Sequence, residues 1–406
     1  MRRSPFRPFA AGVAALAIVA GCAPATDAGP DTTAYLERLG DDTIAVEIVS
    51  RSPGRIEGEV LARSPVTRYM TYSFDLDDAG AIRRFETEHT TPAQNPSGPG
   101  RWHAIVTLNG PLGSVIRTAE GEGPDTLTFT VDGPVVPTIG RVPLPAGVLE
   151  RAIAIVTRAA NEAASPDGPP PEVFGALTPW GSTPSATPMT LVPRGASELE
   201  LDFFGSPMVL SVDEQGRLTG LSGASTTMKV EVEPIPVPEL GPLAARWSAA
   251  DLEGTGLGNP SPTATVEASI DGAALAIRYG RPARRGREIW GALVPWSDVW
   301  RTGANAATHL ATDRALTVGD IELAAGTYTL WSIFTPERGI LIVNDRTQVW
   351  GTAYDPEGDV GRTVMTKETL DEPVERFTIS IEEGPTGGTL ALAWDTTRYS
   401  VPLRVR

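Results

Sequence analysis

Residues 43–50, TIAVEIVS, open the part of the sequence that decides the fold of its first half. Three similar runs follow, separated by turn residues: RIEGEVLAR at 55–63, TRYMTYSFDL at 67–76 and AIRRFETEH at 81–89. In each run, apolar and polar residues alternate over short distances. Because successive side chains of a strand point to opposite faces of a sheet, these runs predict an antiparallel meander with one face in the core and one in water.

The same pattern extends along most of the chain, with one interruption. Strand-like runs recur at 102–108, 113–121 and 125–133, and again from residue 188 onward. Between them, residues 145–164, PAGVLERAIAIVTRAANEAA, carry apolar side chains at helical spacing after a proline. We therefore expect an all-β chain, with one amphipathic helix that covers the open face of a curved meander.

Composition divides the chain into segments. Residues 22–42 are mostly small and polar, which favours a tether, and residues 43–240 hold the first set of strands. Residues 241–260 lose periodicity and contain Pro and Gly, as expected of a linker between domains. From 261–406 a more aromatic strand pattern returns, which predicts a second β domain built as a β-sandwich or jelly roll.

The first residues resemble a bacterial lipoprotein signal peptide. Arginines lie before residue 8, residues 10–20 are apolar, and the small residues 19–21 precede Cys22, the only cysteine in the sequence. The apolar run is too short to span a bilayer as a permanent helix. The resemblance implies that residues 1–21 are removed and that the Cys22 thiol receives a diacylglycerol.

A lipid on Cys22 would place the protein outside the cytoplasm, anchored to the cell envelope. Ala23 follows the cysteine instead of the Asp associated with inner-membrane retention in some bacteria, which points to the outer membrane. The formal net charge of −16 argues against nucleic acid as a partner. The expected partner is therefore the membrane, reached through the lipid.

The sequence shows no cofactor fingerprint and no metal-binding motif. The three histidines, His89, His103 and His309, are far apart, and none forms a metalloprotease motif. Asp75 and Glu86 stand at the first and last positions of a possible calcium loop, but Ala79 replaces a required oxygen ligand. Both flanks of that loop are strand-like, so a hairpin turn is the favoured interpretation and calcium remains an alternative.

The tract at 277–310, IRYGRPARRGREIWGALVPWSDVWRTGANAATHL, contains six arginines and three tryptophans in an otherwise acidic protein. Guanidinium groups so close together repel one another unless carboxylates or a ligand compensate them. Arginine donates in a forked geometry suited to carboxylate, phosphate or sulfate, and tryptophan offers flat faces to sugars or cations.

This tract, followed by ELAAGTYTLWSIF, LIVN, WGTAYD and ALAWDTTRYSVPL, resembles the bacterial domain of unknown function 2911 over residues 261–405. The resemblance implies a bacterial domain, often secreted or lipid-anchored, to which no activity is assigned. The family tract usually carries an acidic residue after the asparagine, whereas Ala306 follows Asn305 here. If that acid serves as a catalytic base in relatives, this chain lacks it.

Two interpretations of the 299–310 loop stay open. In the structural one, Gly303 allows a tight backbone path, Trp300 anchors the loop in the core, and Arg301 binds turn carbonyls or a carboxylate such as Asp298 or Asp355. In the functional one, eight residues surround a shallow anionic or glycan site. These candidate ligand residues are Arg281, Arg285, Arg287, Trp290, Trp300, Arg301, Asn305 and His309.

The preferred hypothesis is a non-catalytic, lipid-anchored binding or structural module for a small anionic or carbohydrate-like ligand or a protein partner. A hydrolase or lyase is the first alternative, and it requires Arg301, Asn305 and His309 to meet at one cavity. In the second alternative, residues 43–240 form a half-barrel that shelters acyl chains, which requires an apolar cavity between helix and sheet.

Overall fold

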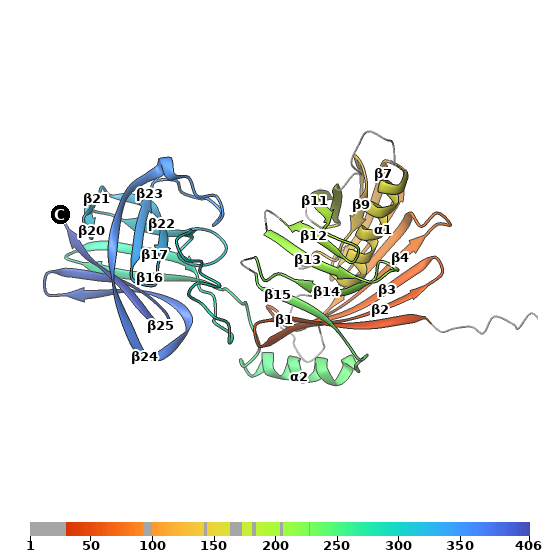
Figure 1. The fold of residues 1–406 in the computed structure, drawn as a ribbon, viewed down its shortest axis with the longest axis horizontal. Helices are drawn as coiled ribbons and strands as arrows, with labels where there is room; N and C mark the ends of the chain where they lie inside the picture. Colours follow the sequence, from red (N-terminus) through yellow and green to blue (C-terminus); the bar gives the residue numbers. More distant parts are fainter. Residues whose placement is uncertain are drawn as a thin grey trace, which may run out of the picture.

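The computed structural model describes residues 30–91, 100–141, 144–162, 173–180, 184–203, 206–226 and 228–406. Within them the chain folds into two β-rich domains with two α-helices, so the all-β fold expected from the sequence is confirmed (Figure 1). Neither described helix is long and apolar enough to cross a membrane. Cys22 and the expected signal peptide lie outside the described residues.

The N-terminal domain is built on one strongly curved sheet of 15 strands. Its hydrogen-bonded order is β8-β7-β6-β5-β4-β3-β2-β1-β15-β14-β13-β12-β11-β10-β9, antiparallel except for the pair β9 and β10. The strands are β1 (Asp31–Leu39), β2 (Asp42–Ser52), β3 (Arg55–Ala62), β4 (Arg68–Leu76), β5 (Ile82–Thr90), β6 (Trp102–Asn109), β7 (Leu112–Ala119), β8 (Asp125–Thr130), β9 (Val135–Pro137), β10 (Val173–Thr178), β11 (Ser185–Pro193), β12 (Glu198–Phe203), β13 (Ser206–Val212), β14 (Leu218–Ser222) and β15 (Val230–Ile235).

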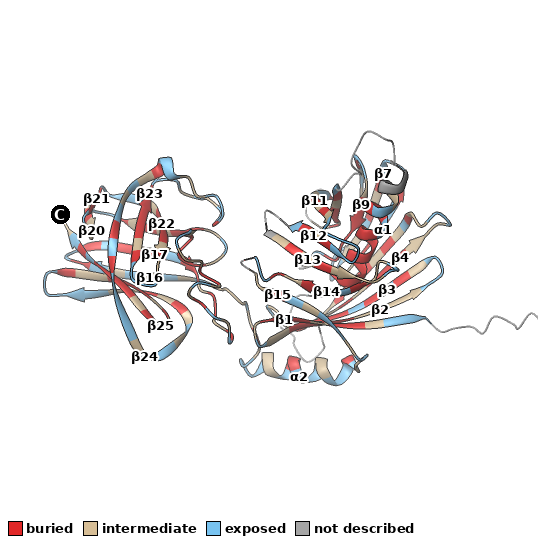
Figure 2. Cartoon of the chain, in the orientation of Figure 1, coloured by how far each residue is buried: buried red, intermediate tan, exposed pale blue. Residues whose placement is uncertain are grey.

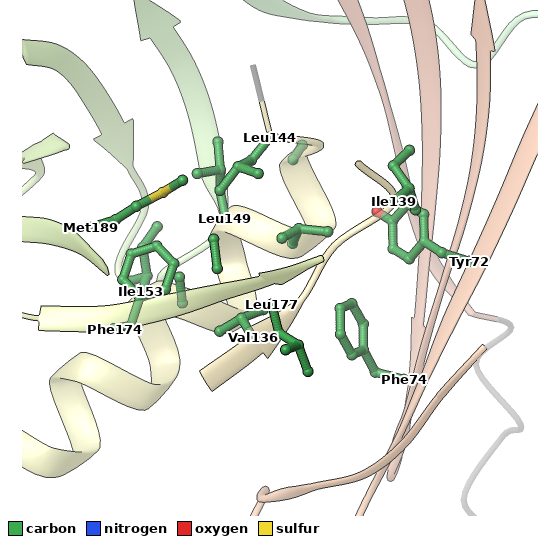
Figure 3. Close-up of a cluster of buried hydrophobic side chains, with 14 of the residues drawn as sticks. Tyr72, Phe74, Val136, Ile139, Leu144, Leu149, Ile153, Phe174, Leu177 and Met189 are labelled. Atoms are coloured by element: carbon green, nitrogen blue, oxygen red, sulfur yellow. The ribbon is translucent and has the colours of Figure 1, made fainter. Parts of the chain in front are cut away.

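Helix α1 (Ala146–Glu162) lies in the concavity of this sheet and falls within the predicted 145–164 (Figure 1). Its apolar side chains, among them Leu149 and Ile153, pack into the core that includes Phe174 and Leu177 of β10 (Figure 3). Figure 2 shows buried residues along α1 and along the strands around it. The helical spacing of the apolar residues is therefore explained by a sheet that wraps around their side of the helix.

Among the described residues, the space recorded between α1 and the sheet is small. The cavity between α1 and the sheet, beside Glu37 and Glu47, has a volume of about 10 Å³. Such a space holds at most one water molecule. In the described part of the domain, the helix and the core cluster thus occupy the place where the half-barrel hypothesis required a cavity for acyl chains.

A buried carboxylate holds the first turn of α1. Glu47 on β2 accepts hydrogen bonds from the backbone N–H groups of Ala146 (2.7 Å) and Gly147 (3.2 Å), and the hydroxyl of Tyr72 also donates to it. Burial raises the pKa of Glu47, although these three hydrogen bonds oppose the shift. Because the first N–H groups of a helix have no partner within the helix, Glu47 satisfies donors that would otherwise be buried without one.

The expected tether over residues 22–42 is wrong in its second half. Residues 31–39 form β1, which pairs with β2 on one side and β15 on the other, near the middle of the sheet. Glu37 is only 6% exposed and forms an ion pair with Arg141. A charged residue thus faces the core because a partner distant in sequence compensates it.

The expected linker over 241–260 is also corrected. Helix α2 (Leu240–Leu252) packs Leu240 and Trp247 against the outer face of β2 and β3. The guanidinium carbon of Arg63 lies 5.3 Å from the centroid of the Trp247 ring, and Asp251 accepts a hydrogen bond from the Thr67 N–H at 2.7 Å. Most of the segment therefore belongs to the N-terminal domain.

The C-terminal domain consists of a second sheet of 10 strands. Nine of them follow the order β16-β17-β19-β22-β23-β24-β25-β20-β21, and the tenth, β18, pairs with β22. Contacts of β16 with β24 and β25 bring the start and the late strands of this path together around one core. The elements are β16 (Thr263–Ile270), β17 (Ala273–Gly280), β18 (Val299–Trp300), β19 (Thr308–Thr312), β20 (Leu316–Val318), β21 (Ile321–Leu323), β22 (Gly326–Phe334), β23 (Gly339–Asn344), η1 (Pro356–Gly358), β24 (Asp359–Gly384) and β25 (Gly387–Val405).

The possible calcium loop is a hairpin turn between β4 and β5. Asp77 accepts hydrogen bonds from the N–H groups of Ala79 (3.0 Å) and Ala81 (2.8 Å), which closes the turn. Asp75 forms an ion pair with Arg55. Among the described residues, no group of three or more His, Cys, Asp or Glu side chains has an arrangement that could hold a metal ion.

Candidate functional site

The two domains meet where the β1–β2 turn contacts the arginine tract. The N–H of Asp41 donates to the carbonyl of Arg285 at 3.1 Å, and the Asp42 carboxylate forms an ion pair with the Arg285 guanidinium. Gly40 has a φ of +63°, and a Cβ added to it would lie 2.1 Å from the Arg285 carbonyl oxygen. Glycine at this position therefore allows both the turn and the close approach of the two backbones.

A pocket of about 240 Å³ lies at this junction. Both domains and the segment between them form its walls. The lining residues are Leu39, Ile44, Met228 and Val230 of the N-terminal domain, Pro260 and Ser261 of the connection, and Pro282, Arg287, Leu293, Trp300, Arg301, Gly303, Ala304, Asn305 and Trp394 of the C-terminal domain. The wall is mainly apolar and includes two guanidinium side chains.

Arg301 is a buried cation with little internal compensation. The residue is 8% exposed, and its Nη1 donates one hydrogen bond, to the Asn305 carbonyl at 3.3 Å. No carboxylate of the described chain forms an ion pair with it, and Asp355 pairs instead with Arg346. Burial lowers the pKa of Arg301, but arginine stays charged at any physiological pH. The pocket wall thus carries a desolvated positive charge with N–H donors to spare.

Arg287 adds a second guanidinium without an ion pair in the described chain, although the charges of Glu375 and Asp42 partly offset its own. Its Nε donates to the Arg284 carbonyl at 3.0 Å and its Nη2 to the Ala283 carbonyl. Burial, followed by the nearby charge of Arg285, lowers the pKa of Arg287, and Arg287 in turn helps to lower the pKa of the partly buried Lys229. Positive charges therefore act on one another here, and an anion in the pocket would relieve that repulsion.

The loop that carries Arg301 is held from both ends. Trp300 is 6% exposed and packs against Phe377 and Trp394, with ring centroids 5.1 and 6.1 Å away. Asn305 has a φ of +64° and its side-chain amide donates to the Ser261 carbonyl at 3.3 Å. The buried Trp300 and the hydrogen-bonded turn at Asn305 agree with the structural interpretation of this loop. Residues of the same loop also line the pocket.

Of the eight candidate ligand residues, Arg287, Trp300, Arg301 and Asn305 line one pocket. Arg281 is engaged with the Phe377 carbonyl (3.2 Å) and the Thr378 hydroxyl (2.9 Å), and Arg285 pairs with Asp42. Trp290 packs in the core against Phe334 and Tyr399. These three side chains contribute to the architecture around the pocket and do not line it.

His309 lies on β19 and does not line the pocket. Its Nδ1 lies 2.8 Å from the Ala307 carbonyl oxygen, and its Nε2 accepts a hydrogen bond from the Gln348 N–H at 3.0 Å. Both ring nitrogens are thus used by the backbone. The hydrolase or lyase hypothesis required His309 at the same cavity as Arg301 and Asn305, and the three side chains do not meet there.

Sequence reasoning missed the other half of the pocket. Leu39, Ile44, Met228 and Val230 are ordinary apolar residues of strands or turns, with no local signal that they line a site. Trp394 belongs to a motif of the recognised C-terminal domain, ALAWDTTRYSVPL, which was the available signal for that residue. The N-terminal wall is defined only by the docking of the two domains.

Comparison with known proteins agrees with the resemblance drawn from the motifs. No curated protein matches the chain. A solved structure of a DUF1089 family protein from Pseudomonas aeruginosa matches at 16% identity, covering 44% of this chain and 90% of its own, with a TM-score of 0.29. Residues 261–403 match the model of the family described as "Protein of unknown function (DUF2911)", and this part of the chain is therefore a DUF2911 domain.

Proposed function

We propose that this chain is a non-catalytic envelope protein that binds a small anion in the pocket between its two domains. The observation that carries the proposal is Arg301, a residue only 8% exposed whose side chain lies on the wall of a 240 Å³ pocket without an ion-pair partner in the described chain. A buried charge without compensation costs several kcal/mol, so its retention favours a ligand as its missing partner. Arg287 strengthens the positive potential of the same wall.

The burial of the tryptophans favours an anion over a sugar. A sugar ring stacks on an exposed aromatic face, whereas Trp300 is 6% and Trp394 1% exposed. Their rings pack on each other and on Phe377 in the core, so little of either ring is open to the pocket. A negatively charged group that accepts hydrogen bonds from the guanidinium groups fits these walls better.

Calorimetric titration tests the binding proposal. The full chain with Cys22→Ser is titrated with acetate, octanoate, inorganic phosphate and sulfate, so that no attached lipid or detergent competes for the pocket. At least one anion is expected to bind, and Arg301→Gln is expected to weaken it by about 10- to 100-fold, the range of a charge-assisted hydrogen bond. Arg278→Gln is the matched control, because Arg278 is exposed in the same tract and does not line the pocket.

We also propose that Cys22 anchors the protein to the bacterial envelope, with the outer membrane as the favoured location. The support is the order of basic, apolar and small residues before the only cysteine in the sequence. Metabolic labelling with an alkyne-tagged fatty acid is expected to mark the chain and to recover it with the membrane fraction. Cys22→Ser is expected to abolish the labelling, and labelling that persists in this variant would refute the anchor.

A further inference from the structure

We infer that the ligand of the junction pocket is an amphipathic monocarboxylate, a molecule with one carboxylate head and an apolar body, and that the N-terminal domain selects it. This inference rests on the proposed anion site and adds the chemical class of its ligand. It draws on three features of the pocket: the division of its walls between the domains, the supply of hydrogen-bond donors, and the available volume.

The charged and apolar walls come from different domains. All four residues that the N-terminal domain contributes, Leu39, Ile44, Met228 and Val230, are apolar. They belong to one hydrophobic cluster that also contains Leu257 of the connecting segment. The arginines come from the C-terminal domain alone. A ligand that contacts both domains therefore needs an anionic group for one and an apolar group for the other.

The geometry of the free donors favours a carboxylate head over a phosphate. Asn305 donates one of its two amide N–H groups to the Ser261 carbonyl, and the Nε and Nη2 of Arg287 each donate to a backbone carbonyl. Arg301 and the other N–H groups of Arg287 remain as the charged donors of the pocket wall. A carboxylate has two oxygens that match the forked geometry of one guanidinium, whereas a phosphate presents more oxygens and more charge to satisfy.

The volume sets the size of the apolar body. A pocket of about 240 Å³ filled at the density of a protein interior holds roughly ten to twelve non-hydrogen atoms. Octanoate is of this size, whereas acetate leaves most of the apolar wall in contact with water. Each methylene that leaves water strengthens binding, so affinity is expected to increase with chain length until the pocket is full.

The test compares four probes on the full Cys22→Ser chain by calorimetry: acetate, hexanoate, octanoate and octyl phosphate. Octanoate is expected to bind about 100-fold more tightly than acetate, with hexanoate between them. Octyl phosphate, which has the same tail, is expected to bind more weakly than octanoate. A change in tryptophan fluorescence on addition of octanoate provides a second readout, because Trp300 and Trp394 line the pocket.

Variants of the apolar wall separate this inference from the proposed function. Met228→Gln keeps the length of the side chain and is expected to weaken octanoate by about tenfold while acetate binding stays unchanged. Val230→Thr, which keeps the side-chain shape, is expected to act in the same direction. Leu252→Gln is the matched control, since Leu252 is 54% exposed on α2 and lies outside the pocket wall.

Each outcome decides one of the two claims. If acetate, or a phosphate, binds as tightly as octanoate, or if both wall variants bind octanoate normally, the inference about the ligand class is wrong and the anion site stands. If none of these anions nor sulfate binds, or if binding survives Arg301→Gln, the proposed function itself falls. Unfolding curves of each variant establish that a loss of binding is not a loss of fold.

Discussion

Asp42 of the N-terminal sheet forms an ion pair with Arg285 of the C-terminal domain, and the Arg285 side chain is only 5% exposed. Next to this pair, a Cβ added to Gly286 would lie 1.8 Å from an Asp41 carboxylate oxygen. The backbones of the two domains thus approach each other too closely for a larger residue at Gly40, and a larger residue at Gly286 would displace the Asp41 side chain. This contact holds the two walls of the pocket next to each other.

Asp42→Asn is expected to loosen this contact. It leaves the buried Arg285 guanidinium without its carboxylate partner. The free energy of unfolding is expected to fall by about 1 to 3 kcal/mol, less than for a fully buried pair, because the Asp42 side chain is 35% exposed. Scanning calorimetry is expected to show the two domains unfolding further apart in temperature than in the unmodified chain. Asp320→Asn, at an exposed turn of the C-terminal domain, serves as the control. Identical traces for all three chains would show that the ion pair does not couple the domains.

Arg301→Met is expected to stabilise the empty protein while it removes binding. Methionine fills a similar space without a desolvated charge, so the free energy of unfolding is expected to increase by about 1 kcal/mol. Arg281→Met is expected to do the opposite, by about 1 to 2 kcal/mol, because Arg281 donates to the Phe377 carbonyl and the Thr378 hydroxyl. Chemical denaturation measures both changes. A large loss of stability in Arg301→Met would mean that Arg301 serves the architecture and not a ligand.

Glu47→Ala is expected to destabilise the N-terminal domain by about 2 to 4 kcal/mol. It leaves the N–H groups of Ala146 and Gly147 buried without an acceptor at the start of α1. Tyr72→Phe removes only one of the donors to Glu47 and is expected to cost less, about 1 kcal/mol. Urea titration followed by circular dichroism ranks the two variants. The reverse order would contradict the role of Glu47 at the helix terminus.

Acid is expected to destabilise the N-terminal domain through His89. Burial, followed by the charge of Arg68, lowers the pKa of His89 to about 3. Its ring is 3% exposed and stacks on Trp102 at 3.5 Å between centroids. The His89 side chain therefore binds a proton near pH 6.5 in the unfolded chain but not in the folded chain. Stability is complete above that pH and falls by up to about 1.4 kcal/mol per pH unit as the pH drops from about 6.5 toward 3.

His89→Phe, which keeps a flat ring beside Trp102, is expected to remove this part of the acid dependence. Unfolding midpoints measured from pH 7 to pH 4 for the two chains give the difference directly. His103→Gln provides the control, because His103 is half-buried on β6 and bonded to Glu86. An unchanged pH slope in His89→Phe would show that His89 titrates in the folded state as it does in water.

The strands and α1 follow from local patterns, because burial of one face imposes a period on the sequence. The local patterns did not predict two elements, β1 and α2, and each of these failures has a physical reason. β1 places Glu37 in the core, which the alternation of apolar and polar residues does not allow unless Arg141 compensates the charge. In α2, Gly241 and Pro242 signal a break, yet both lie in the first turn, where proline is tolerated because its missing N–H has no helical partner.

The sequence by itself determined the β character of both domains, the helix between the strands, the DUF2911 domain and four residues of the pocket. The tertiary structure alone decided which arginines remain uncompensated and that Leu39, Ile44, Met228 and Val230 complete the wall. The physical reason is that hydrogen bonds, ion pairs and apolar contacts act over a few ångströms, whereas these residues are separated from Arg301 by at least 71 positions along the chain.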